Sequence, residues 1–456
     1  MTLRWLSRSV FDLDQGQSLS RYSLGMRRAV GVVSLVIALA CAVSLFATSS
    51  QAVPGTTLLF SGATLIDGTG SAPVANAVLV VRDGRVDAVR ISAGAPPAGA
   101  GRVVDLAGKF IIPGLISAHA HISDIDGLKP AAYTAENTMR QLGVFARYGI
   151  TTLWSLGGER APAFEARGAQ NSPTLDRARI YLAGEIITAV TPEAARERVA
   201  TDAATKPDVI KIRVDDDLGT ASKMTPAVYT AVIDEAHKRG LRVAAHVFYL
   251  DDAKGLLRAG VDVIAHSVRD QDIDAEFIAM MKARNAPYIP TLTRELSTFV
   301  YESTPAFFTD PFFLREADAA LVAQLQEPAR QAAMRTSASA KAYKAALIVA
   351  KRNLKKAADA SVLIAMGTDS GALPERFEGY FEHLELEMMA DAGMTPAQIL
   401  RAGTSDAARA MKLDSVGKLT KGAWADFVVL DKNPLADIKN TRSIASVWVA
   451  GNRVKR

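Results

Sequence analysis

Short apolar runs alternate with longer segments of helical periodicity through the middle of the chain. Most of these runs are rich in β-branched residues. They span residues 111–121, 150–154, 178–184, 207–212, 241–247, 261–267, 286–292 and 361–369. Strands that alternate with amphipathic helices of about 10–15 residues predict parallel βαβ units. Eight units over about 250 residues predict an α/β fold of the (β/α)₈ type, a TIM barrel.

The two ends of the pattern differ from this middle part. Residues 53–112 and 416–456 hold short β-rich runs that are broken by Gly, Asp and Asn, which are turn signals. We expect these two segments to form one small sheet domain that is built from both ends of the chain. The barrel then occupies residues 113–415, and the mostly helical segment 293–360 is expected to cover its mouth.

Residues 1–52 form a separate segment. A pair of arginines precedes a long apolar stretch, and the small residues Ser50 and Ala52 follow it. This pattern is typical of a signal peptide, and its apolar length also suits a transmembrane anchor. We expect export to the periplasm or the medium with cleavage near Ala52, and membrane anchoring as the alternative. Met1 and Met26 both remain open as the translation start.

Composition narrows the function classes. Of the 456 residues, 49% are hydrophobic and 22% are charged, which is ordinary for a globular protein. The net charge of +5 falls to +2 beyond residue 52, because the first 52 residues carry five Arg and two Asp. No basic tract is present, so we expect a small-molecule substrate and no nucleic-acid partner. The single cysteine, Cys41, lies in the N-terminal apolar stretch, so the cleaved protein is expected to lack disulfides. A homo-oligomer remains open.

Six polar residues stand at or near the ends of the predicted strands. They are His119, His121, Lys211, His246, His266 and Asp369. Side chains two residues apart in a strand project to one side, so the rings of His119 and His121 can converge on one point. Barrels of this kind build their active sites at the C-terminal ends of the strands. The other histidines, His237 and His383, are expected in packing or surface roles, with a place at the mouth left open for His383.

Each of these residues also has a structural explanation. Asp369 could cap a helix, His246 and His266 could be core residues, and Lys211 could pair with an acid such as Asp215 or Asp216. Together these explanations are hard to sustain, because buried charged groups are almost never left unpaired. A shared metal ion would satisfy all of them.

Several stretches distributed over residues 57–456 resemble one known family. They are TLIDGTG, IIPGLISAHAH, DVIKI, AAHV, DVIAHS, MGTDSG, AGMTPAQILRAGTSDAARAM and GKLTKGAWADFVVLDKNPL. Together they resemble the amidohydrolase superfamily, and more closely its imidazolonepropionase-like and metal-dependent dipeptidase branch. The resemblance implies a barrel that is flanked by a composite β-sandwich.

The resemblance also implies two divalent metal ions, which we expect to be zinc because imidazole and carboxylate ligands suit it. Its implied ligands are His119, His121 and Asp369 on the first metal, His246 and His266 on the second, and carboxylated Lys211 bridging both. Imidazolonepropionases use one metal and lack this lysine, so Lys211 argues against that activity.

The expected chemistry is hydrolysis of an amide (C–N) bond. Metal ions activate water and polarise a substrate carbonyl, and Asp369 is expected to take the proton from the water and pass it to the leaving group. The same site could instead cleave a lactone or a phosphoester, because the barrel alone does not fix the function. A non-catalytic exported barrel that binds a metal or ligand is a third possibility, which the complete ligand set with Asp369 disfavours.

Residues after the predicted strands are candidates for substrate binding. They are Tyr249, Arg269 and Arg294, with Thr291 nearby. An arginine could hold a substrate carboxylate through two hydrogen bonds, which favours a dipeptide or an N-acyl amino acid as substrate. Arg269 could equally pair with Asp270 and hold a loop in place.

Overall fold

The computed structural model describes residues 57–91, 101–129 and 133–455. All described residues belong to one compact unit, residues 51–456. The expectations for residues 1–52 therefore lie outside the described residues. Within the described ranges, no helix has both the length and the apolarity that a bilayer span requires.

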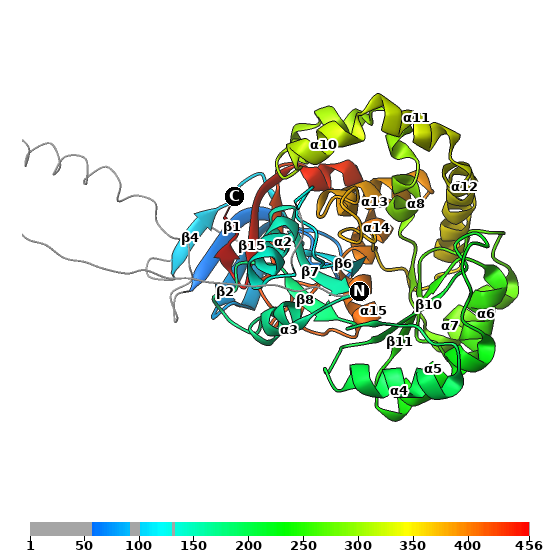
Figure 1. Ribbon diagram of the computed structural model, residues 1–456. Coiled ribbons are helices and arrows are strands. Elements are labelled where there is room, and N and C mark those ends of the chain that lie inside the picture. The colour runs from blue at the N-terminus through cyan, green and yellow to red at the C-terminus, as the bar shows by residue number, and fades with distance from the viewer. Residues whose placement is uncertain (1–56, 92–100, 130–132, 456) are drawn as a thin grey trace, which may run out of the picture. The chain divides into compact units, whose positions relative to one another are not determined.

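Strands from both ends of the chain share one eight-stranded sheet, whose blue and red arrows lie together in Figure 1. Its strands are β1 (Leu58–Leu65), β2 (Val74–Arg82), β3 (Arg85–Ile91), β4 (Arg102–Asp105), β5 (Phe110–Pro113), β14 (Phe427–Leu430), β15 (Ile444–Val449) and β16 (Asn452–Arg453). The order is β16-β15-β14-β5-β1-β2-β3, and β4 pairs with β1. Phe60 packs edge-on against Phe427 and Trp448, at centroid distances of 4.8 and 4.7 Å, so aromatic residues from both ends form this sheet's core.

The middle of the chain forms two parallel sheets. One orders β6 (Leu115–Ala120), β7 (Ile150–Ser155) and β8 (Arg179–Leu182). The other orders β13 (Tyr288–Ile289), β12 (Val263–Ala265), β11 (Val243–Val247), β10 (Ile210–Val214) and β9 (Ile186–Ile187). Parallel bridges join Tyr288 to Ile364 and Ala120 to Ser370. The segment 364–370 therefore connects β13 to β6 and brings Asp369 beside the end of β6.

Two predicted strands differ from the structure. The run 111–121 is divided at Gly114 into β5 and β6, which belong to different sheets. A Cβ atom at Gly114 would lie 1.9 Å from the Thr151 hydroxyl oxygen, so only glycine permits this close approach. The run 361–369 forms isolated bridges and no continuous strand, because its amides bond first to β13 and then to His119 in β6.

Helices connect the parallel strands and fill the expected insertion. Between the strands lie α2 (Ala135–Arg147), α3 (Ala161–Gly168), α4 (Pro192–Ala203), α5 (Pro226–Lys238), α6 (Leu250–Ala259) and α7 (Ala275–Arg284). The insertion holds α8 (Leu292–Ser297), η1 (Val300–Glu302), η2 (Ala306–Thr309), α9 (Pro311–Leu314), α10 (Ala319–Leu325), α11 (Pro328–Thr336) and α12 (Ala338–Asp359). After it come α13 (Tyr380–Asp391), α14 (Pro396–Ala402), α15 (Ser405–Met411) and η3 (Ile438–Arg442).

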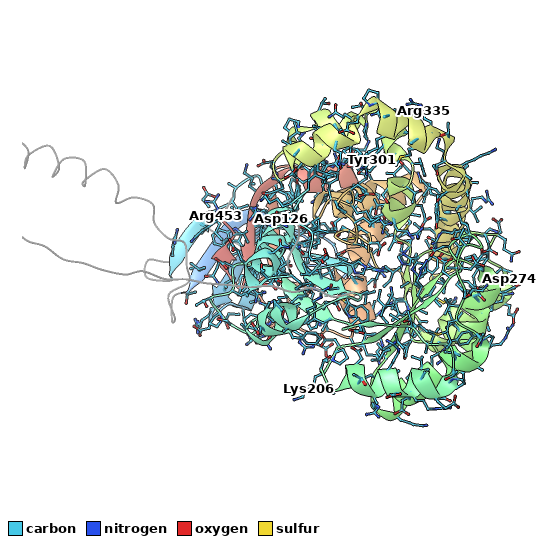
Figure 2. All side chains as sticks on the ribbon, in the orientation of Figure 1. Asp126, Lys206, Asp274, Tyr301, Arg335 and Arg453 are labelled. Carbon is cyan, nitrogen blue, oxygen red and sulfur yellow. The ribbon has the colours of Figure 1, made fainter. Side chains whose placement is uncertain are left out.

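The insertion is attached to the loop that follows Asp369. Tyr301 lies inside the insertion and Arg335 lies at its outer edge (Figure 2). The buried Tyr301 hydroxyl donates to the Glu375 carbonyl at 2.5 Å. This bond ties the insertion to the segment that carries Asp369.

A buried ion pair joins the parallel strands to the C-terminal strands. Arg179, at the start of β8, donates to Asp426 at 2.7 Å, and both side chains are at most 2% exposed. The Asp426 carboxylate also accepts the Ala450 amide, and its carbonyl accepts the Gly114 amide. Asp426 is therefore shared by β8, the β5–β6 junction and the C-terminal strands.

Candidate metal centre

Three predicted ligands converge at the end of β6. His119 belongs to β6, His121 follows it, and Asp369 comes from the 364–370 segment. The Asp369 Oδ1 atom lies 3.2 Å from His119 Nε2 and 2.9 Å from His121 Nε2. Among the described residues, these three form a possible metal site, because their ligand atoms all lie within 4.8 Å of one another.

The hydrogen bonds of His121 fit a cation at this point. Its Nδ1 lies 3.0 Å from the Gly157 carbonyl oxygen and its Nε2 lies 2.9 Å from Asp369 Oδ1, so both nitrogens face acceptors. A neutral imidazole has one N–H and can donate to one of them. A metal ion between Nε2 and Asp369 would resolve the conflict, with the Gly157 carbonyl fixing the Nδ1–H tautomer.

The second predicted pair, His246 and His266, stands beside this group. Their ring centroids lie 4.2 Å apart, and those of His266 and His119 lie 4.4 Å apart. His246 Nε2 contacts Asp215 Oδ2 at 2.7 Å, and His266 Nδ1 contacts the Thr291 hydroxyl at 2.7 Å. These contacts leave His246 Nδ1 and His266 Nε2 free to bind a metal, the arrangement that ligating histidines usually show.

Lys211 completes the predicted set. It lies in β10, is 2% exposed, and its Nζ atom is 3.3 Å from His119 Nε2. Asp215 pairs with His246, so the alternative of a Lys211–Asp215 pair is not what forms. Burial lowers the pKa of Lys211 to about 8, because a buried ammonium loses its hydration. A neutral amine is therefore accessible at this position near neutral pH.

Burial also sets the charge of the other groups. It lowers the pKa of His119 and His266 well below the usual value, and the pKa of His246 to about 3. These rings are therefore neutral, which is the form that binds metals. Burial alone would raise the pKa of Asp369, but Arg376 and the two histidine bonds outweigh it and hold this pKa well below its usual value.

The backbone is strained at three positions of the centre. His266, Thr291 and Asp369 have φ values of 74°, 49° and 63°, in the left-handed region that favours glycine. Such conformations persist only where surrounding contacts enforce them, and they cluster at functional sites. Here the strained backbone belongs to two predicted ligands, His266 and Asp369, and to Thr291, which bonds to His266.

Arg269, a predicted substrate-binding residue, is enclosed by groups of the chain itself. It is 1% exposed, its Nη1 donates to the carbonyls of Val247 and Ser267, and its Nε lies 3.1 Å from Glu295. The guanidinium therefore holds the ends of β11 and β12 together. The structure favours the alternative of a loop-holding ion pair, with Glu295 as the acid and not Asp270.

Arg294 and Tyr249 occupy less enclosed positions. Arg294 uses Nη1 on Glu295 at 3.1 Å and lies over the Tyr343 ring, with its charge close enough to influence Asp369. Burial would lower the pKa of Arg294, but Glu295 reverses the effect and raises it. The Tyr249 hydroxyl donates to Asp216 at 2.8 Å, and this contact together with burial raises its pKa. His383 is buried against Tyr148, and its packing role is the one observed.

Two buried acids were missed by the sequence analysis as supports of the centre. Asp215 directly follows β10 and comes four residues after Lys211, an even spacing that could have indicated it. Glu159 accepts from the Ser155 hydroxyl at 2.5 Å and from the Gly157 amide at 2.8 Å, which positions the carbonyl that His121 uses. Burial raises the pKa of Glu159 to about 7.

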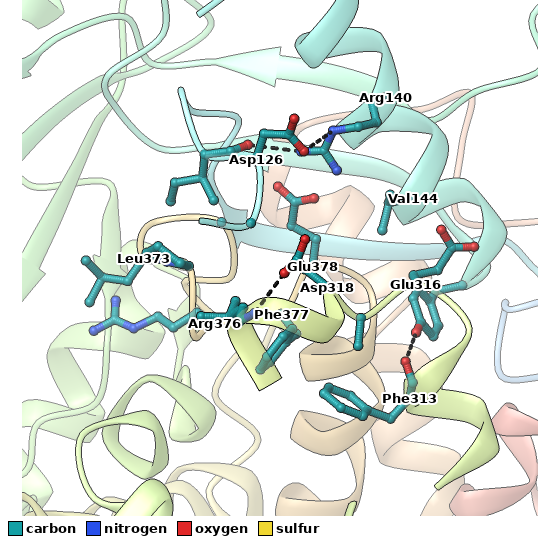
Figure 3. Close-up of a pocket in the computed structure, with 17 residues that line it drawn as sticks. Asp126, Arg140, Val144, Phe313, Glu316, Asp318, Leu373, Arg376, Phe377 and Glu378 are labelled. Atoms are coloured by element: carbon teal, nitrogen blue, oxygen red, sulfur yellow. Dashed lines mark hydrogen bonds and ion pairs between the residues drawn. The ribbon is translucent and has the colours of Figure 1, made fainter. Parts of the chain in front are cut away.

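Arg376 was also missed, because no periodicity marks the loop in which it lies. Its Nη1 contacts Asp369 Oδ2 and its Nε donates to the Ser297 hydroxyl at 3.0 Å. Arg376 and Glu378 line a cavity of ≈160 Å³ together with residues of α2 and of the 313–321 segment (Figure 3). None of the predicted metal ligands lines this cavity, and the lining residue Arg376 contacts one of them, Asp369.

Proteins of known sequence match part of the chain. An uncharacterized protein of Mycobacterium tuberculosis is 29% identical over 212 residues, which cover 43% of this chain and 54% of the relative. Ochratoxinase of Aspergillus niger is 25% identical over 246 residues, 53% of this chain and 43% of the enzyme. An imidazolonepropionase of Streptomyces avermitilis is 30% identical over 106 residues, 23% of this chain and 25% of the enzyme. The chain thus spans about half or less of the length of these curated relatives.

Solved structures and a family sequence model match a larger part of this chain than the curated relatives do. A Bifidobacterium longum protein assigned as a prolidase has a TM-score of 0.71 at 25% identity, covering 89% of this chain and 96% of that one. A Xaa-Pro dipeptidase has a TM-score of 0.70 at 21% identity, covering 88% and 100%. These likenesses imply a TIM-barrel-like α/β fold. The sequence model of the amidohydrolase family matches residues 110–454. The chain therefore belongs to the amidohydrolase family of hydrolases.

Proposed function

We propose that this protein is a binuclear metal-dependent amidohydrolase that cleaves an amide bond in a small carboxylate-bearing substrate, such as a dipeptide or an N-acyl amino acid. The observation that carries the proposal is the convergence of His119, His121 and Asp369, with the free nitrogens of His246 and His266 beside them. The names of a dipeptidase and an ochratoxinase among the similar proteins support an amide bond over a lactone or a phosphoester.

The ligand residues fit divalent metals. His119, His121 and Asp369 would hold the first metal, and His246 and His266 the second, with zinc the metal that suits these donors. Bound metals supply activation of water and polarisation of the carbonyl. Lys211 is proposed to bridge them after its neutral amine adds to carbon dioxide, which forms an N–C bond and releases one proton to give the carbamate.

The chain's own residues would move the proton and hold the substrate. Asp369, kept anionic, accepts a proton from the attacking water and returns it to the leaving nitrogen. Arg376 holds the second oxygen of Asp369 and orients it. Arg294 has donors beyond the Nη1 atom that Glu295 occupies, and it would bind the substrate carboxylate. Tyr249 lies farther out and would contact the remainder of the substrate.

The domain plan and the location belong to the same proposal. We propose that the parallel strands of residues 113–415 close into a (β/α)₈ barrel, and that residues 53–112 and 416–456 form the composite β-sandwich. The shared eight-stranded sheet supports the second part. The signal-like pattern of residues 1–52 supports an exported protein.

Two measurements test the function. Elemental analysis of the gently purified protein should give about two zinc equivalents per chain, and ¹³C-labelled bicarbonate should give a carbamate signal that Lys211→Ala abolishes. The zinc-loaded protein is then assayed with dipeptides, N-acyl amino acids, lactones and phosphotriesters. One equivalent or less of metal, with Lys211→Ala unchanged, would refute the binuclear centre.

Arg294→Met tests the substrate class. We expect it to raise KM for an N-acyl amino acid by about 10-fold or more, because a charge-assisted bond is lost. The matched control substrate is the same compound with its carboxylate converted to a carboxamide, for which KM should change little. Equal KM changes for both substrates would assign Arg294 a role other than carboxylate binding.

A further inference from the structure

Two buried glutamates project from one face of α13 toward the metal centre. Glu382 and Glu385 are three residues apart on this helix, and both are fully buried. Neither is a predicted ligand, and no cation contacts either of them among the interactions of the described residues. Their hydrogen bonds go instead to segments that carry ligands.

Glu382 holds the segments of the first ligand group. Its Oε1 atom accepts from the hydroxyls of Ser117, Thr368 and Ser370, at 3.1, 2.7 and 2.6 Å. Ser117 lies two residues before His119, and the other two residues flank Asp369. One carboxylate oxygen therefore links β6 to the 364–370 segment. It bonds to one residue near His119 and to the two residues on either side of Asp369.

Glu385 holds a segment that belongs to the second pair. It accepts from the Leu292 amide, the Thr293 amide and the Thr293 hydroxyl, each at 2.8 Å. The preceding residue, Thr291, has a φ of 49° and bonds to His266 Nδ1. A β-branched residue rarely adopts this conformation, so it must be enforced by its surroundings. Glu385 enforces it by fixing the two amides that follow.

We infer that α13 positions the ligands of the two metal subsites separately, Glu382 those of the first and Glu385 the His266 side of the second. The inference rests on the proposed binuclear site. Both glutamates are positioning residues, because they reach the metals only through other residues. Positioning contacts of this kind typically change metal affinity by about 10–100-fold.

The replacements follow from the bonds. Both oxygens of Glu385 accept hydrogen bonds from backbone amides. Glu385→Gln therefore places an NH₂ group against one of these N–H groups and breaks that hydrogen bond. Only one Glu382 oxygen accepts, and a glutamine could still satisfy it, so Glu382→Met is the better removal. Ser370→Ala and Thr291→Ala are milder second variants that each remove one bond, and Thr291→Ser, which keeps the hydroxyl, should restore affinity.

The experiment measures zinc affinity at each subsite by chelator competition. The full chain carrying His246→Ala reports the first subsite, and the full chain carrying His121→Ala reports the second. Glu382→Met should weaken zinc binding about 10–100-fold in the first background and less than about 3-fold in the second. Glu385→Gln should show the reverse. Glu387→Gln is the control, because this glutamate on the same helix pairs with Arg442 and contacts no ligand segment.

The outcomes separate the inference from the proposed function. Crossed losses, with matching smaller losses for Ser370→Ala and Thr291→Ala, support separate positioning. Equal losses in both backgrounds, or none in either, overturn it while the binuclear site stands. A wild-type chain that binds no zinc overturns the proposed function and this inference together. Spectra of the cobalt-loaded single-subsite proteins give an independent readout, because altered ligand geometry changes their absorption.

Discussion

Asp369→Asn removes the charge from a carboxylate that contacts two histidines and Arg376. Asparagine cannot accept and return a proton, so turnover of the best amide substrate should fall by about 10²–10⁴-fold. That loss corresponds to about 2.7–5.4 kcal/mol of barrier height. The change also leaves Arg376, which is 7% exposed, without its acid. Breaking a buried pair costs about 3–5 kcal/mol of folding free energy. The lower end is expected, because the Ser297 hydroxyl still accepts from Arg376.

A double variant separates these two effects. Adding Arg376→Gln to Asp369→Asn removes the unpaired charge, so it should restore part of the lost stability and none of the turnover. The assay measures turnover, metal content and thermal melting for the wild type, both single variants and the double variant. If Asp369→Asn keeps near-normal turnover with its metals bound, or if the double variant recovers turnover, Asp369 is not the proton shuttle.

Three further outcomes are expected. Asp426→Asn should lower the free energy of unfolding by about 3–5 kcal/mol in denaturant melts, because it breaks the buried pair with Arg179, whereas Asp359→Asn in an exposed pair should change it by less than about 0.5 kcal/mol. Burial raises the pKa of Glu378 to about 8. The stability that its protonated form contributes is therefore present at low pH and is lost as the pH rises through about 8. Glu378→Gln should melt at a higher temperature than the wild type at roughly pH 9 and not at roughly pH 5. N-terminal sequencing of the protein from its native host should find a start near residue 53, and a cytoplasmic protein with Met1 or Met26 intact would contradict export.

The hydrophobic pattern of the chain was enough to predict which residues stand at the strand ends. A period of two along short apolar runs predicts strands, and parallel strands place their C-terminal ends at one edge. That reasoning placed His119, His121 and Asp369 at one edge with the other candidate ligands, and the family resemblance grouped these three. The structure has their ligand atoms within 4.8 Å of one another. It also assigned the β-rich ends to one unit, and their strands share a sheet.

The side chains that contact these residues could not be predicted from that pattern, because they depend on how the folded chain packs. Arg269 and Arg294 look equivalent in sequence, yet Arg269 bonds to two backbone carbonyls, whereas Arg294 bonds to Glu295 and lies over the Tyr343 ring. The support from Glu382 joins residues 265 positions apart in the chain. Periodicity reports the face on which a side chain lies, and it carries no information about the helix that packs against that face. The supports of the centre come from such packing, because a buried polar group takes whichever partner the folded chain brings within hydrogen-bond distance.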